Sequence, residues 1–282
     1  MTPIKTALCS FGMSGWVFHA PFISLNPGFE LHSVWERSKK LAKEKYPSIV
    51  SRDTYESLLA DDEVELVVVN TPNYTHYDYA KKALLAGKHV IVEKPFTITS
   101  AEGIELIKLA AQQGKMLSVF QSRRNDSDFK TVKKVVTEKL LGDMVETEIH
   151  YDRFNEALSP KVHKETPGPG ANILYDLGSH LVDQALQLYG MPIAVFGDLA
   201  IMRPIAKVDD YMEVLLYYPG SRVRLKASYV VREGFPSYVL HGSKGSFLKS
   251  SGLPQRLAGM RLSMDLLLSG SLRNASVLSV AI

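Results

Sequence analysis

The sequence predicts an α/β protein with a doubly wound parallel sheet in its first part and an α+β domain with an open, mostly antiparallel sheet in its second. Two observations predict this division. Residues 3–120 alternate strand-like and helix-like segments, which is typical of a parallel sheet with helices on both faces. After residue 121 the alternation stops, and from Ile193 onward only strand-like runs follow, joined by short turns such as Pro219-Gly220.

In the first part, hydrophobic periodicity and turn residues define each element. Pro21 should kink or split the first helix, while Gly87 and Gly114 end two later helices. The run "ELVVVN" at residues 65–70 is typical of a strand buried on both faces. We expect strands over Ile4–Ser10, Phe29–Glu36, Glu65–Asn70, His89–Val92 and Met116–Gln121, and helices over Ser14–Leu25, Lys39–Lys45, Tyr55–Leu59, Tyr77–Leu85 and Ala101–Gln113.

In the second part, two helices precede a run of strands. The helices are expected near Asp128–Lys139 and over Tyr175–Leu188, with a Pro- and Gly-rich loop at residues 166–170 before the second. The strands are expected over Val145–Phe154, Ala194–Met202, Tyr211–Tyr217, Arg222–Val231 and Ser237–His241. We therefore divide the chain into a first domain at residues 1–121, a second at 122–249 and an atypical tail at 250–282.

Composition excludes several classes of protein. The net charge of +3 over 282 residues is too small for a nucleic-acid footprint, so we expect no nucleic-acid partner. Cys9 is the single cysteine, which rules out a disulfide or a cysteine-based metal site within one chain, and we expect no metal. No apolar run is long enough to span a bilayer, and the N-terminus lacks a secretory pattern, so we expect a cytoplasmic protein without a membrane partner.

The stretch "CSFGMSG" at residues 9–15 is almost G-x-G-x-x-G, with Ser10 in the place of the first glycine. It lies between a predicted strand and a predicted helix. At such a helix N-terminus, backbone N–H groups bind a pyrophosphate, and glycines let the chain approach it closely. We therefore expect a dinucleotide site formed by Gly12, Met13, Ser14 and Gly15, provided that the backbone angle of Ser10 is ordinary.

The end of the second strand gives conflicting signals about the dinucleotide. Glu36 stands where an acidic residue holds the adenosine ribose, which favours NAD. Arg37 and Ser38 follow directly, and an arginine with a hydroxyl favours the 2′-phosphate of NADP. Arg37 can equally be a solvated side chain. The choice between NAD and NADP stays open at this point.

Two further motifs follow predicted strands. Ligands of open α/β sheets bind beyond the carboxyl ends of strands, which places Thr71, Pro72, Asn73 and His76 of "VNTPNYTH" at that edge. Alternatively, Asn73 or Thr75 caps the next helix. In "VIVEKPF", Glu93 and Lys94 end another strand, and Lys94 could stabilise a developing oxyanion of a substrate. The Lys94–Pro95 bond is a candidate cis peptide, although a Lys-Pro pair is also an ordinary loop boundary.

In "YDLGSHLVDQAL", Asp176 and His180 are four residues apart and so share one face of a helix. A histidine with a carboxylate one turn away suits general acid–base chemistry near neutral pH. The alternative is a capping or surface pair without a catalytic role.

Together these motifs resemble the Gfo/Idh/MocA oxidoreductases, the glucose-fructose oxidoreductase and inositol dehydrogenase-like enzymes. "TPNYTH", "EKP" and "YDLGSH" match the family's TPN-x-x-H, E-K-P and D-x-G-x-H, and the match covers residues 4–249. "GMSGWVFHAPF" and "SRRNDSDF" resemble the scyllo-inositol dehydrogenase-like subgroup, although Asn125 stands where that subgroup usually has tryptophan.

The resemblance implies an N-terminal Rossmann domain, an NAD or NADP cofactor, and hydride transfer to or from a C–OH group of a sugar or cyclitol. It implies Lys94 and His180 as a catalytic pair that Asp176 assists. The same resemblance implies that Asn73 and His76 lie near the nicotinamide, and that Glu93 and Lys94 lie near its ribose and the reaction centre as cofactor-binding residues. It also implies that Arg123 and residues 151–154, including Tyr151 and Arg153, face the substrate. The second sheet would carry a homodimer or homotetramer contact.

Two alternatives remain beside an NAD(P)-dependent dehydrogenase or reductase. One is a non-catalytic dinucleotide-binding sensor or regulator, although a sensor has no need of Lys94, Asp176 and His180. The other is an enzyme inactivated by its C-terminus. The family pattern stops near Lys249, and the Ser- and Leu-rich residues 250–282 contain no lysine. We therefore expect this tail to be a shifted reading frame or a truncation.

Overall fold

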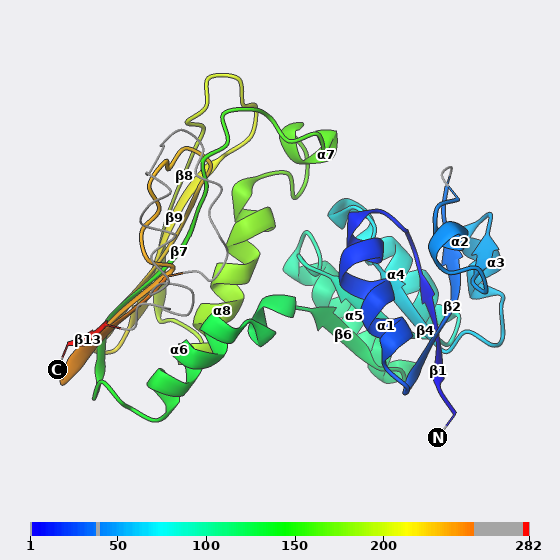
Figure 1. The fold of residues 1–282 in the computed structure, drawn as a ribbon, viewed down its shortest axis with the longest axis horizontal. Helices are drawn as coiled ribbons and strands as arrows, with labels where there is room; N and C mark the ends of the chain where they lie inside the picture. The colour runs from blue at the N-terminus through cyan, green and yellow to red at the C-terminus, as the bar shows by residue number, and fades with distance from the viewer. Residues whose placement is uncertain (1, 38–39, 251–278, 282) are drawn as a thin grey trace, which may run out of the picture. The chain divides into compact units, whose positions relative to one another are not determined.

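A computed structural model describes residues 2–37, 40–250 and 279–281. Contacts divide the chain into two compact units, Met1–Gln121 and Ser122–Ile282 (Figure 1). Each unit has its own sheet and its own hydrophobic core. Among the described residues, no helix is both long and apolar enough to cross a membrane.

The first unit contains a six-stranded sheet of order β3-β2-β1-β4-β5-β6 in which every pairing is parallel. This confirms the predicted doubly wound sheet. Strand β3, which has only three residues and pairs with β2 along one edge, was not predicted. The strands are β1 (Ile4–Leu8), β2 (Phe29–Trp35), β3 (Val50–Arg52), β4 (Leu66–Val69), β5 (His89–Glu93) and β6 (Leu117–Phe120).

Helical segments connect these strands. The predicted helix over Ser14–Leu25 is split as expected, with Pro21 in the first turn of its second half. Thr54 and Thr99 each form a capping box, which fixes where α3 and α5 begin. The segments are η1 (Ser14–His19, π-helical), α1 (Ala20–Leu25), α2 (Ala42–Lys45), α3 (Tyr55–Leu59), η2 (Asn73–Thr75), α4 (His76–Leu85) and α5 (Ser100–Gln112).

Strand β4 shows why this sheet needs helices on both faces. All four of its residues are buried. Val67 and Val69 belong to one hydrophobic cluster, whereas Val68 belongs to another. Successive side chains of a strand point to opposite faces, so each face of the sheet packs against its own apolar layer. The carboxyl ends of the strands are thereby left as the edge on which polar residues can gather.

The second unit contains a seven-stranded sheet of order β13-β12-β11-β7-β10-β9-β8. Only the β7–β10 pairing is parallel, which confirms a mostly antiparallel sheet. Strands β12 and β13 and the short helix α7 were not predicted. The elements are η3 (Ser122–Asn125), α6 (Ser127–Thr137), β7 (Met144–Asp152), α7 (Val162–Glu165), η4 (Leu174–Gly178, π-helical), α8 (Ser179–Tyr189), β8 (Ala194–Ala200), β9 (Tyr211–Tyr218), β10 (Ser221–Ser228), β11 (Tyr238–Gly242), β12 (Gly245–Lys249) and β13 (Ser279–Ala281).

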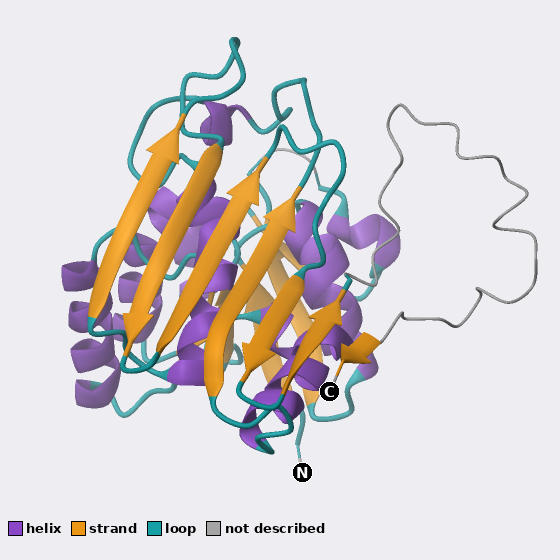
Figure 2. Cartoon of the chain, turned by 90° about the vertical axis from the view of Figure 1, so that its left-hand side faces the viewer, coloured by secondary structure: helices purple, strands orange, loops and turns teal. Residues whose placement is uncertain are grey.

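The described helices of the second unit cover one face of its sheet. Along β9 and most of β10, buried side chains alternate with partly exposed ones, and the buried set packs with Leu177, Leu181 and Ala185 from η4 and α8. Figure 2 shows the strands side by side, and no described helix of this unit lies over the face turned to the viewer. The opposite set, including Glu213 and Arg224, therefore remains at an open face. Except for β13, the tail lies outside the described residues.

Candidate functional site

The loop after β1 is held to the end of β4 by three hydrogen bonds between Ser10 and Asn70. The Ser10 N–H donates to Asn70 Oδ1 (2.9 Å), Asn70 Nδ2 donates to the Ser10 carbonyl (2.9 Å), and Ser10 Oγ donates to the Asn70 carbonyl (3.0 Å). Ser10 is not among the residues with positive φ, so its backbone does not require glycine. The serine is thus accommodated in the loop, and its hydroxyl adds one of the three bonds.

The two glycines of the loop differ in the space around them. A Cβ on Gly15 would lie 2.3 Å from the Ser10 carbonyl oxygen, so only glycine lets η1 pack this closely against the strand end. A Cβ on Gly12 would meet nothing within 4 Å. Open space beside one glycine and close packing beside the other fit a loop that a pyrophosphate approaches from outside. Met13 and Ser14 lie between them, and η1 begins at Ser14.

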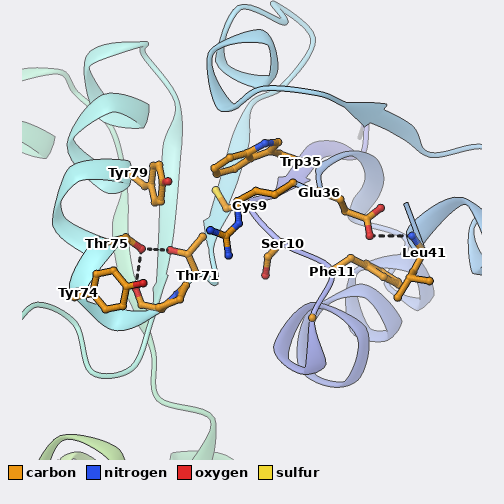
Figure 3. A pocket seen from close by; sticks show the side chains of 13 residues that line it. Cys9, Ser10, Phe11, Trp35, Glu36, Leu41, Thr71, Tyr74, Thr75 and Tyr79 are labelled. Atoms are coloured by element: carbon orange, nitrogen blue, oxygen red, sulfur yellow. Dashed lines mark hydrogen bonds between the residues drawn. The ribbon is translucent and has the colours of Figure 1, made fainter. Parts of the chain in front are cut away.

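A cavity of about 340 Å³ lies at the carboxyl ends of β1, β2 and β4. Figure 3 shows Trp35 and Tyr79 on one side of it and Phe11 and Leu41 on another. The aromatic lining was not predicted as part of the site, although Trp35 directly precedes Glu36 in the sequence. The lining residues are Cys9, Ser10, Phe11, Gly12, Trp35, Glu36, Arg37, Leu41, Thr71, Pro72, Tyr74, Thr75 and Tyr79.

Glu36 is buried at the rim of this cavity, with 6% of its surface exposed. Its Oε1 accepts a hydrogen bond from the Leu41 N–H (3.0 Å), which Figure 3 shows. Its Oε2 accepts one from the Ala42 N–H (3.1 Å). These are the amides at the start of α2, which begins three residues later than predicted. Arg37 also lines the cavity and is exposed, whereas Ser38 lies outside the described residues.

The segment after β4 contributes both to the cavity and to the loop next to it. Thr71 Oγ1 and Thr75 Oγ1 are 2.7 Å apart, and Thr75 Oγ1 also donates to the Pro72 carbonyl (2.6 Å). Thr75 is the residue before α4, but its side chain does not cap that helix. Asn73 Oδ1 accepts from the Tyr74 N–H within the same turn (3.0 Å).

His76 is almost fully buried, with 1% of its surface exposed. Its Nδ1 lies 2.8 Å from the Pro95 carbonyl oxygen and its Nε2 lies 3.0 Å from the Thr71 carbonyl oxygen. Burial lowers the pKa of His76, although both carbonyl contacts oppose this shift. The residue therefore ties the loop after β4 to the loop after β5, from inside the unit.

Glu93 connects the end of β5 to the π-helical segment η1. Its Oε1 accepts from Ser14 Oγ (2.5 Å) and lies 2.8 Å from His19 Nε2, while its Oε2 accepts from the Lys94 N–H (3.1 Å). Burial raises the pKa of Glu93, but the bonds from His19, Ser14 and Lys94 outweigh burial and leave the pKa lowered. His19 is itself buried beside Phe120, with ring centroids 4.4 Å apart.

Lys94 is thus fixed through both of its neighbours. Glu93 is held by Ser14 and His19 on one side, and the Pro95 carbonyl is held by His76 on the other. The Lys94–Pro95 peptide bond is cis, which confirms that part of the prediction.

In the second unit, His180 is the second residue of α8 and is 7% exposed. Gly178 of the "YDLGSH" motif allows this placement, because a Cβ there would lie 2.6 Å from Met212 Sδ on β9. The Tyr151 ring lies 6.2 Å from the His180 ring, and the Arg123 guanidinium lies 5.6 Å from the centre of the Tyr151 ring. Burial raises the pKa of Tyr151 to about 12, so its hydroxyl stays protonated near neutral pH.

Asp176, in η4, faces two groups that the sequence analysis did not name. Lys164 Nζ donates to its Oδ1 (2.6 Å) and the Tyr229 hydroxyl donates to its Oδ2 (3.3 Å). Burial, followed by the charge of Asp176, raises the pKa of Tyr229. Nothing in the local sequence indicates these partners, because they come from α7 and from the end of β10. Arg153, the remaining substrate candidate, is exposed after β7.

A second polar cluster in the first unit consists of His32, Asp61 and Glu63, whose side-chain ligand atoms lie within 4.8 Å of one another. Asp61 Oδ2 is already bonded to His32 Nε2 (3.0 Å) and to Arg52 NH2 (2.5 Å), and Glu63 pairs with Lys5. These ion pairs join β2, β3 and the turn after α3.

A parallel sheet with a glycine loop and an apolar cavity at its carboxyl edge defines a Rossmann-type dinucleotide-binding unit. The chain matches the "Oxidoreductase family, NAD-binding Rossmann fold" over residues 4–121 and the "GFO/IDH/MocA C-terminal domain" over residues 129–248. The chain therefore belongs to the GFO/IDH/MocA family of oxidoreductases, as the motifs predicted, and its first unit is an NAD-binding domain.

Relatives and solved structures agree with this assignment. The uncharacterized oxidoreductase YdgJ of Escherichia coli is 40% identical over 89% of this chain and 72% of its own length. The scyllo-inositol 2-dehydrogenase (NADP(+)) IolW of Bacillus subtilis is 35% identical over 87% of this chain and 68% of its own. The crystal structure of an oxidoreductase from Bacillus cereus, 32% identical, aligns with a TM-score of 0.80 over 88% of this chain and 71% of its own.

Proposed function

We propose that this oxidoreductase transfers hydride between NAD or NADP and a C–OH or C=O group of a sugar or an inositol-like cyclitol. One observation carries this proposal above the others. Lys94, at the carboxyl edge of the sheet, is fixed on one side through Glu93 and on the other through the Pro95 carbonyl. Such anchoring suits a side chain that must meet one substrate oxygen. The cyclitol class is supported by similarity to IolW.

The cofactor and substrate would be held by separate sets of residues. Gly12, Met13, Ser14 and Gly15 would take the pyrophosphate through backbone N–H groups. The turn at residues 71–73 would lie against the nicotinamide half. His76 and Glu93, which the sequence analysis placed beside the dinucleotide, would act by holding these loops, because buried contacts already occupy their polar atoms. Arg123, Tyr151 and Arg153 would contact the substrate.

In the oxidative direction a C–H and an O–H bond of the substrate carbinol break and a C=O bond forms. The dinucleotide, when bound, supplies the nicotinamide that accepts the hydride. His180 would accept the hydroxyl proton as a general base. Lys94 would stabilise the negative charge that develops on the oxygen. Asp176, held by Lys164 and Tyr229, would orient this machinery.

Turnover of cyclitols tests this proposal directly. The purified protein is titrated with NADH and NADPH by nicotinamide fluorescence, and then supplied with oxidised dinucleotide and inositol stereoisomers or aldoses. We expect one of these polyols to be oxidised. Lys94→Met and His180→Gln should each lower kcat by about 10²- to 10⁴-fold while dinucleotide affinity is retained. His241→Gln is the control. His241 lies on β11 and its Nδ1 is bonded to Ser246 on β12, outside η4 and α8.

Two results would contradict the proposal. Full turnover in Lys94→Met would remove the catalytic role of this residue. Dinucleotide binding without reduction by any polyol would instead favour a binding protein that senses the dinucleotide.

A second copy of this chain is the partner that we propose for the open face of the second sheet. On that face Arg224 pairs with Glu148 (2.7 Å) and with Glu213 (3.0 Å), so charges of both signs lie side by side. A two-fold contact brings the same patch against itself, which mixed charges permit. Sedimentation should give a dimer or tetramer, and Arg224→Glu should shift it toward monomer. A monomeric wild type would contradict this contact.

A further inference from the structure

The adenosine end of the cavity contains one acidic and one basic residue in succession, Glu36 and Arg37. A carboxylate there accepts hydrogen bonds from the free ribose hydroxyls of NAD, whereas an arginine binds the 2′-phosphate of NADP. The sequence leaves these signals in conflict. The surroundings of the two side chains show which of them is open to a ligand.

The Glu36 carboxylate is already committed to the protein. Each of its oxygens accepts a backbone N–H at the start of α2, at 3.0 and 3.1 Å, and the residue is 6% exposed. Charge-assisted bonds of this kind are among the stronger ones in proteins, and breaking them leaves buried amides unpaired. A ribose hydroxyl would have to compete with these amides. Glu36 therefore holds the start of α2, where Leu41 lines the cavity.

Arg37 differs in each of these respects. It lines the cavity and is exposed. Among the residues that the structure describes, none forms an ion pair with it, although Lys40 three positions away pairs with Asp53 at 2.9 Å. With Glu36 bonded to the amides of α2, the Arg37 guanidinium is the cavity charge that is open to a ligand. A planar guanidinium matches a phosphate with two parallel hydrogen bonds.

We infer that the adenosine end of this cavity is built for a 2′-phosphate, and that Arg37 selects NADP(H) over NAD(H) while Glu36 holds the start of α2. This inference rests on the proposed dinucleotide site but goes beyond it, since that proposal holds for either cofactor. The selectivity acts at the ribose and is independent of which polyol is turned over.

Separate fluorescence titrations with NADPH and NADH test the inference without any substrate. We expect NADPH to bind at least about tenfold more tightly than NADH at moderate salt. Equal affinities, or tighter binding of NADH, would overturn the inference and leave the proposed function standing. Binding of neither dinucleotide would overturn both.

Three variants identify the group responsible. Arg37→Gln should weaken NADPH by about 10- to 100-fold and leave NADH nearly unchanged, because only the phosphate contact is lost. Lys40→Gln removes a nearby cation that is paired with Asp53 and should leave the NADPH-to-NADH ratio unchanged.

Glu36→Gln tests whether Glu36 holds the start of α2 or binds the ribose. It should weaken both dinucleotides by the same factor and lower the melting temperature, because a glutamine side chain can accept only one of the two α2 amides. A loss confined to NADH would show that Glu36 binds the ribose, and would overturn its assignment here.

Discussion

The two units organise their functional residues in different ways. In the first unit, polar side chains at the sheet edge mostly bond to backbone or to each other: Ser10 with Asn70, Glu36 with the start of α2, and Glu93 with His19. In the second unit the candidate residues are side chains from separate elements. His180 lies on α8, Tyr151 on β7 and Arg123 on η3.

This difference matches the two kinds of ligand. NAD and NADP differ only at the 2′ position of one ribose, so a site for the rest of the dinucleotide can be fixed once from backbone and buried polar pairs. A substrate site built from exposed or half-buried side chains can change by substitution without disturbing the fold. We infer that the first site fails when a buried contact is lost, whereas the second tolerates changes that alter only its chemistry.

Substitution of Gly15 should have the largest effect and tests whether the first site fails when a close contact is disturbed. Gly15→Ala places a methyl group 2.3 Å from the Ser10 carbonyl oxygen, so the loop must move. We expect a loss of about 1–3 kcal/mol in the free energy of unfolding, together with loss of dinucleotide binding. Urea unfolding and nicotinamide fluorescence measure the two effects.

Gly12→Ala is the matched control, because its methyl group would meet nothing within 4 Å. Its stability should stay within about 0.5 kcal/mol of wild type, while dinucleotide affinity falls because the methyl group occupies the approach of the pyrophosphate. Unchanged dinucleotide affinity in Gly12→Ala would place the pyrophosphate elsewhere.

Much of the first unit could be predicted from sequence because its signals are local. Buried apolar runs, the split at Pro21 and the spacing of Gly12 and Gly15 each act within a few residues. The hydrogen-bond partners of the Glu36 carboxylate could not be predicted, because they depend on where the N–H groups at the start of α2 lie in the folded chain. Strand β3 was missed for a similar reason, since its three residues form a strand only by pairing with β2.

In the second unit strands β7 to β11 were predictable but their order in the sheet was not. Strand β7 lies between β10 and β11, and its parallel pairing with β10 joins residues about 76 positions apart, such as Glu148 and Arg224. No local pattern encodes such a pairing. The same holds for the Lys164 and Tyr229 contacts of Asp176, which depend on this order.

A smaller effect should come from His19, whose partner Glu93 is buried. His19→Phe keeps a ring beside Phe120 but removes the hydrogen bond to Glu93, and it should cost about 1–3 kcal/mol of stability. His19→Gln retains a donor and should recover part of that loss. Because the folded pKa of Glu93 is lowered, its contribution is present above its unfolded pKa and is lost as pH falls through the folded value.

Stability measured between pH 3 and 7 should therefore show a smaller acid loss in His19→Phe than in wild type, because the folded pKa of Glu93 rises toward its unfolded value when the His19 contact is removed. An acid limb identical to wild type would mean that the His19 contact does not set the charge of Glu93.

The smallest effect should come from His150, a buried residue of β7. Glu148 Oε2 lies 3.0 Å from its Nε2 and Asp152 Oδ2 lies 3.4 Å from its Nδ1. Burial lowers the pKa of His150, but the two carboxylates outweigh burial and leave the pKa raised. The resulting stability is fully present below the unfolded histidine pKa of about 6.5 and is lost as pH rises through the folded value.

Unfolding free energies of wild type and His150→Gln should therefore converge as pH rises from about 6 to 9. Subtracting the two profiles isolates His150 from His76, whose lowered pKa acts in the opposite direction. A parallel pair of profiles would contradict the raised pKa. Convergence with unchanged dinucleotide affinity would sharpen the contrast between the two units. Charges on the second sheet would then affect stability alone, whereas those at the edge of the first sheet affect both stability and dinucleotide binding.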